Sequence, residues 1–107
     1  MTKPIDVLSQ EDVQIIRECL SAAEKEGFFP EWEFETLFGI SRSKVSAVLA
    51  KWPDVDVYDP DVSAAIVGAL NHLLGYPHAQ DDLWNKYISV GPDGVRSTLD
   101  HLLALGV

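Results

Sequence analysis

The chain is poor in cysteine and has no long apolar segment. It has one cysteine, Cys19, so no disulfide can form within the chain, and isolated thiols are typical of reducing compartments. No apolar run approaches the ~20 residues that a membrane-spanning helix needs. Residues 1–12 lack the apolar core of a secretory signal. We therefore expect a cytoplasmic protein with no membrane attachment.

Basic residues are also scarce, and they are unevenly placed. Lysine and arginine number 8 against 17 aspartates and glutamates, which gives a formal net charge of -9. Residues 39–52 contain Arg42, Lys44 and Lys51 and no acidic residue, whereas the segments on either side are acidic. Such a surface repels nucleic acid and anionic membranes at long range and favours a basic partner. Many bacterial cytosolic proteins are acidic simply to stay soluble, and that interpretation stays open.

Motifs of catalysis and metal binding are missing. The chain has no H-E-x-x-H, no paired-cysteine motif, no glycine-rich phosphate loop and no G-x-S-x-G. The aspartates of residues 54–61 break the spacing of an EF-hand, because Tyr58 holds its fifth place and Ala65 its last. We predict no catalytic residue, no metal site and no cofactor. An enzyme would require His72 and His78 to converge with aspartates.

The residues that are present favour a helical protein. Hydrophobic residues make up 47% of the chain, enough for a buried core at this length. Apolar residues recur at helical spacing, and only residues 31–35 and 54–58 alternate as a strand would. We expect an all-α, compact single domain of about six helices over residues 1–107. The expected helices follow Ser9 and Ser41, cover 30–38, 60–74 and 81–88, and run from 92 to 105.

Several residues predict where these helices begin and end. Ser9, Ser41 and Asp59 are placed to cap the helices that follow them. Gly27 is expected to end the first long helix in the left-handed conformation. These positions divide the chain into short helices joined by tight connections.

The helix at 60–74 is expected to be central. Between its first and last apolar residues it has no charged side chain, if His72 is neutral. A helix at the surface would show charge on the side away from its main apolar stripe. We therefore predict neighbours on both sides, a close approach at Gly68, and a buried Asn71 with hydrogen-bond partners.

Residues 34–49 resemble the helix-turn-helix family. Gly39 stands at the turn, Ile40 follows it and Ser41 caps the second helix, while the inward positions are Phe34, Phe38, Val45 and Val48. The resemblance implies that one set of exposed residues would face the major groove of DNA. That set is Arg42, Ser43, Lys44 and Ser46. The alternative function is therefore a DNA-binding regulator that uses residues 34–51.

Two features argue against DNA binding. Glu35 stands where the family pattern has a small residue, four positions before the turn glycine. Specific duplex binding commonly uses ~6–10 phosphate contacts, and this stretch offers three basic residues beside a run of glutamates. Nucleic acid is therefore the less favoured partner.

Large aromatic residues favour a hypothesis of protein binding. Trp32 lies among Glu31, Glu33 and Glu35, and this acidic segment is the first candidate surface for a partner. Trp84 and Tyr87 form a second candidate patch, since such residues are enriched at interface hot spots, while Trp52 is expected in the core. We expect a non-enzymatic acidic protein that binds another, basic protein, such as an inhibitor or immunity-type protein. Its oligomeric state is not indicated by the sequence.

Overall fold

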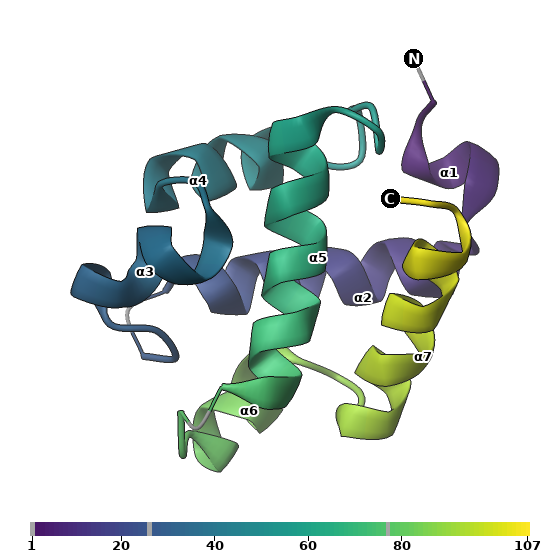
Figure 1. Cartoon of the computed structure of the whole chain (residues 1–107). Helices are drawn as coiled ribbons and strands as arrows, with labels where there is room; N and C mark the ends of the chain where they lie inside the picture. The colour runs from purple at the N-terminus through teal and green to yellow at the C-terminus, as the bar shows by residue number, and fades with distance from the viewer. Residues whose placement is uncertain (1, 26, 77) are drawn as a thin grey trace.

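The computed structural model describes residues 2–25, 27–76 and 78–107. Within these ranges the chain forms seven α-helices and no strand, which confirms the all-α prediction (Figure 1). The helices are α1 (Pro4–Val7), α2 (Gln10–Glu24), α3 (Glu31–Phe38), α4 (Arg42–Lys51), α5 (Pro60–Gly75), α6 (Asp81–Tyr87) and α7 (Pro92–Ala104). No described helix has both the length and the apolar character needed to cross a membrane.

Three of the predicted helix starts are confirmed by side-chain caps. The hydroxyls of Ser9 and Ser41 each accept a backbone N–H of the first turn, at 3.0 and 3.3 Å. One carboxylate oxygen of Asp59 accepts two such N–H groups, at 3.0 and 3.3 Å. These bonds satisfy donors that have no partner within the helix. The predicted left-handed end at Gly27 is wrong, because α2 ends earlier, at an extended Lys25.

The central position of α5 is confirmed. It packs against α2, α3, α4 and α7. Figure 1 shows it crossing α2, with α3 and α4 on one side and α7 on the other. Ile66 and Leu70 are fully buried, and helices α2 to α7 all contribute side chains to the same core cluster.

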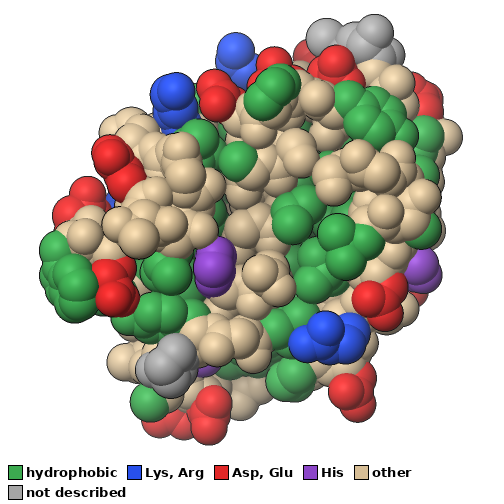
Figure 2. All heavy atoms as spheres, viewed as in Figure 1, with side chains coloured by type: hydrophobic (Ala, Val, Ile, Leu, Met, Phe, Trp, Pro, Cys, Tyr) green, Lys and Arg blue, Asp and Glu red, His purple; other side chains and the backbone are tan. Residues whose placement is uncertain are grey.

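The outward side of α5 agrees with the prediction only in part. A Cβ built on Gly68 would lie 2.9 Å from Cδ2 of Phe38, so this glycine allows the close approach of α3. Asn71 is exposed, so the prediction that it is buried is wrong. Ala64 and Val67 are half-buried. One side of α5 thus faces solvent, and Figure 2 shows hydrophobic side chains gathered on this face of the molecule.

Two short segments lie outside the six expected helices. The single turn of α1 was not expected, because four residues are too few to display a helical period. Residues 54–58 alternate like a strand but form a loop, in which Val55 and Val57 point into the protein. The loop is tied to the amino-terminal segment by a hydrogen bond from the backbone N–H of Val57 to the carbonyl of Thr2, at 2.9 Å.

Candidate functional site

The helix-turn-helix-like unit is present and consists of α3, a tight turn and α4. Gly39 adopts the left-handed conformation with φ of 73°, and its N–H donates to the Glu35 carbonyl at 2.8 Å. Ile40 is buried in the turn, and Phe34 and Phe38 are buried on the inward side of α3. We call these two helices and their turn the α3–α4 unit. Its backbone consists of two helices joined by a tight turn, so what it can bind depends on where the polar side chains point.

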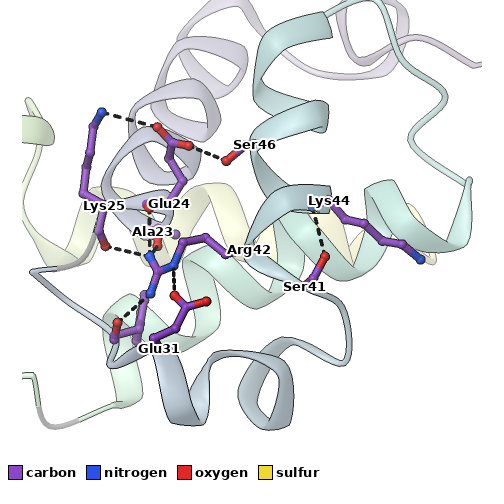
Figure 3. Close-up of polar contacts among 9 residues, drawn as sticks. Ala23, Glu24, Lys25, Glu31, Ser41, Arg42, Lys44 and Ser46 are labelled. Atoms are coloured by element: carbon purple, nitrogen blue, oxygen red, sulfur yellow. Dashed lines mark hydrogen bonds and ion pairs between the residues drawn. The ribbon is translucent and has the colours of Figure 1, made fainter.

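Arg42, the first residue of α4, points into the molecule. Its guanidinium donates to the carbonyl oxygens of Ala23, Glu24 and Lys25, at 3.3, 2.8 and 3.0 Å (Figure 3). A further bond, of 2.8 Å, reaches the carbonyl of Phe29. The arginine therefore binds the end of α2 and the connection that leads to α3.

These contacts cap the carboxyl-terminal end of α2. The last carbonyls of a helix lack partners within it and carry partial negative charge, so a cation there is favourable. Arg42 also lies over the Phe34 ring, with Cζ 4.3 Å from the ring centre, and its Nε donates to Glu31 at 2.7 Å. Only 14% of the arginine side chain is exposed, and each of its three nitrogens already donates within the protein. The prediction that Arg42 is an exposed residue of α4 is therefore wrong.

Ser46 also faces α2 and not solvent. Its hydroxyl donates to a Glu24 carboxylate oxygen at 2.5 Å. This bond is the main cause that holds the pKa of Glu24 below its ordinary value, and Lys25, 3.3 Å from the same carboxylate, adds to the effect. Ser46 links two helices and is half-buried, so the prediction that it is exposed is also wrong.

Ser43 and Lys44 are the members of that set that are exposed. Lys44 Nζ lies 3.7 Å from a carboxylate oxygen of Asp61. Beside α4 is a hollow of about 330 Å³, whose charged lining consists of Lys44, Lys51, Asp54, Asp56, Asp59 and Asp61. A phosphate placed there would meet more negative than positive groups. Lys44 and Lys51 therefore lie close to aspartates of the loop before α5 and of the first turn of α5.

The residues of the acidic segment of α3 (31–35) differ in their exposure and in their contacts. Trp32 is 79% exposed. Glu33 accepts a hydrogen bond from the hydroxyl of Tyr76, which ties α3 to the end of α5 and raises the pKa of that tyrosine. Glu31 is in the ion pair described above, yet its side chain stays 76% exposed. Glu35 is exposed and, within the described ranges, makes no side-chain hydrogen bond or ion pair.

Three of these residues, Glu31, Trp32 and Glu35, form what we call the outward face of α3. Residues three or four apart on a helix are neighbours, so Glu35 adjoins both of the other two. In Figure 2 a hydrophobic side chain is flanked by acidic ones at the left edge, where α3 lies in Figure 1. The result is an exposed indole between two carboxylates.

The second predicted patch, Trp84 and Tyr87, is less exposed than a partner-binding surface requires. Trp84 is 7% exposed and donates its indole N–H to the Val90 carbonyl at 2.8 Å, so it is a core residue. Tyr87 beside it is half-buried. Trp52 is 4% exposed, which confirms its predicted place in the core. Trp32 is thus the one tryptophan of the three that a partner can reach.

His72 and His78 each form a hydrogen bond with a backbone carbonyl. His72 donates its Nε2 proton to the Leu37 carbonyl at 2.6 Å, and Nε2 of His78 lies 3.1 Å from the Leu73 carbonyl. His72 therefore links α5 to the backbone of α3, and His78 contacts the backbone of α5. Among the described residues, no three histidine, cysteine, aspartate or glutamate side chains are grouped to hold a metal ion.

One buried polar cluster was missed by the sequence analysis. Asp12 is 6% exposed, accepts the Thr98 hydroxyl at 2.8 Å and lies 2.8 Å from Nδ1 of His101. The two partners follow it by 86 and 89 positions, so no local spacing could indicate the cluster. Both carboxylate oxygens are satisfied, and the cluster joins α2 to α7.

Comparison of the chain with protein-family models, with curated proteins and with solved structures found no match. The functional conclusion therefore depends on the geometry of the side chains.

Proposed function

We propose that this chain is a non-enzymatic protein that acts by binding another, basic protein through the outward face of α3. The observation that carries the proposal is the 79% exposure of Trp32 between two exposed carboxylates. Tryptophan is large and mostly apolar, so folded proteins bury most of its surface on average. Trp52 and Trp84 follow that tendency and Trp32 does not.

The two kinds of group on this face have separate roles in binding. Carboxylates attract a basic partner over distance and raise the rate of encounter, more so at low salt. An indole that enters a pocket of the partner removes apolar area from water and slows dissociation. A net charge of -9 adds to the long-range attraction.

The scaffold holds this face in one orientation. On the inward side of α3, the rings of Phe34 and Phe38 stack with centres 4.3 Å apart and planes at 1°. Arg42 and Tyr76 fix the helix from α4 and from the end of α5. A surface that is already ordered loses little conformational entropy on binding, which favours affinity.

Size and acidity fit an inhibitor or immunity-type protein for a basic partner. We place the protein in the cytoplasm, because Cys19 is a buried free thiol, as expected in a reducing compartment. Burial raises the pKa of that thiol, so it stays protonated and unreactive.

The structure offers less support to DNA binding by residues 34–51. Arg42 and Ser46 are committed to contacts with α2, and Lys44 lies next to carboxylates. A specific duplex-binding surface needs several free cations. We therefore prefer the protein partner.

The test is capture of a partner from an extract of the native organism on immobilised protein. Wild type is compared with Trp32→Ala and Glu35→Lys, and with the control Leu103→Ala, which also removes an exposed apolar side chain (53% exposed). We expect a protein of high isoelectric point to be retained by wild type and by the control and lost from both α3 variants. Retention by all four proteins, or an acidic captured protein, contradicts the proposal.

A further inference from the structure

The protein already holds one arginine with a ring and a carboxylate of α3. Cζ of Arg42 lies 4.3 Å from the centre of the Phe34 ring. The Nε of Arg42 donates to Glu31 at 2.7 Å (Figure 3). Phe34 and Glu31 are three positions apart, so they are neighbours on the helix surface. One aromatic ring and one carboxylate at this spacing thus bind the face and the edge of a single guanidinium.

The same two kinds of group recur on the outward face. Trp32 and Glu35 are also three positions apart, in the reverse order along the helix. Both are exposed, and within the described ranges neither side chain has a hydrogen-bond or ion-pair partner. Arg42 fills the first pair, Phe34 and Glu31, whereas Trp32 and Glu35, which we call the outward pair, are open to a partner.

We propose that an arginine side chain of the partner occupies the outward pair. Its guanidinium stacks on the indole of Trp32, and its edge donates to the carboxylate of Glu35. This inference rests on the proposed function, since it names the chemistry by which the same basic partner is recognised. Glu31, exposed on the same face, adds negative potential to the site.

Arginine suits this pair better than lysine. Its guanidinium is planar and weakly hydrated, so the face can stack on a ring while the edge forms hydrogen bonds to a carboxylate. Tryptophan has the most favourable ring for such contacts. The ammonium of lysine is a compact and strongly hydrated charge, which can pair with Glu35 but gains less from the indole.

The experiment uses two peptides as probes, hexa-arginine and hexa-lysine, both acetylated and amidated. Each is titrated into isotope-labelled protein, and the indole N–H resonance of Trp32 is followed by nuclear magnetic resonance. We expect the arginine peptide to bind about threefold more tightly or better, as a cation–π contact at an exposed site predicts. Shifts should centre on the Trp32 indole and the Glu35 amide.

Three variants separate stacking from general charge. Trp32→Leu keeps an apolar side chain without a ring, so the ratio of the two affinities should fall to about one. Glu35→Gln should weaken the arginine peptide. Glu11→Gln removes an exposed carboxylate of α2 and should leave the ratio unchanged.

Equal affinities for the two peptides, no binding of either, or a ratio that survives Trp32→Leu would overturn the arginine site. These failures are distinct from failure of the proposed function. A captured partner that needs Trp32 but tolerates replacement of its own arginines by lysine overturns only the arginine site. A partner whose capture ignores Trp32 overturns both.

Discussion

Two pairs of residues in the α3–α4 unit show how position on a helix decides the role of a side chain. Phe34 and Trp32 are aromatic, lie two positions apart on α3, and are 1% and 79% exposed. Arg42 and Lys44 are basic and lie two positions apart on α4, and their side chains are 14% and 58% exposed. Residues two apart on a helix point about 200° apart. The inward member of each pair therefore holds the unit together, and the outward member is exposed to solvent.

The largest effect is expected from the aromatic pair. Phe34→Ala should lower the free energy of unfolding by about 3–5 kcal/mol, because it leaves a cavity under the Arg42 guanidinium and beside Phe38. Trp32→Ala should change it by no more than about 0.5 kcal/mol, as surface substitutions do. Urea denaturation of the two variants measures both values. Losses of similar size would show that Trp32 packs into the core.

For the basic pair, Arg42 and Lys44, we expect a smaller difference in stability between the two alanine variants. Arg42→Ala is expected to cost about 2 kcal/mol or more, since it removes charged hydrogen bonds to the end of α2. Lys44→Ala should cost less than about 0.5 kcal/mol, because its ion pair is exposed. Arg42→Lys, which keeps the charge but loses the planar guanidinium, is the control. Its loss of stability should fall between the losses of the two alanine variants. Denaturation midpoints that are equal for the two alanine variants would contradict the assigned roles.

The smallest effect concerns Ser46 and its neighbour Ser43. The folded-state pKa of Glu24 is below its ordinary value, so its contribution to stability is complete above the ordinary pKa of about 4.3 and is lost as the pH falls through the folded pKa. Ser46→Ala should raise that pKa and lower stability at neutral pH, with a gap to wild type that narrows in acid. Carboxyl resonances and urea denaturation across pH measure this. Ser43→Ala, an exposed control, should behave as wild type, and an unchanged Glu24 pKa in Ser46→Ala would refute the link.

Local signals in the sequence predict the helices well but not their polar contacts. Ser9, Ser41 and Asp59 cap helices because capping needs only the next few residues. Arg42 finds its carbonyl partners 13 to 19 positions earlier, so its inward direction could not be read from spacing. The spacing therefore predicts a surface residue at Arg42, whereas the structure shows that Arg42 binds the end of α2.

The sequence predicts the exposure of Trp32 but not the burial of Trp84. Trp32 has glutamates on both sides and lies opposite Phe34, so its outward position follows from the period of α3. Trp84 has no acidic residue directly on either side, so the signal that indicates the exposure of Trp32 is missing there. The acceptor of the Trp84 indole N–H, the carbonyl of Val90, lies beyond the end of α6.

The structure also identifies the cleanest charge reversal for the binding site. Glu31 and Glu33 have partners inside the protein, so reversing either charge would disturb Arg42 or Tyr76 as well as the surface. Glu35 carries no such contact within the described ranges, and Glu35→Lys changes the outward face alone. It should lower the association rate of a basic partner at low salt, with a loss that shrinks as salt rises.

The most direct test of the binding surface is the dissociation rate of the captured partner from Trp32→Ala, measured by surface plasmon resonance. If the indole anchors the partner, its removal should cost ~2 kcal/mol or more, which corresponds to roughly 30-fold faster dissociation. Leu103→Ala should dissociate as wild type does. A dissociation rate for Trp32→Ala within about twofold of wild type, with the fold intact, would contradict the account.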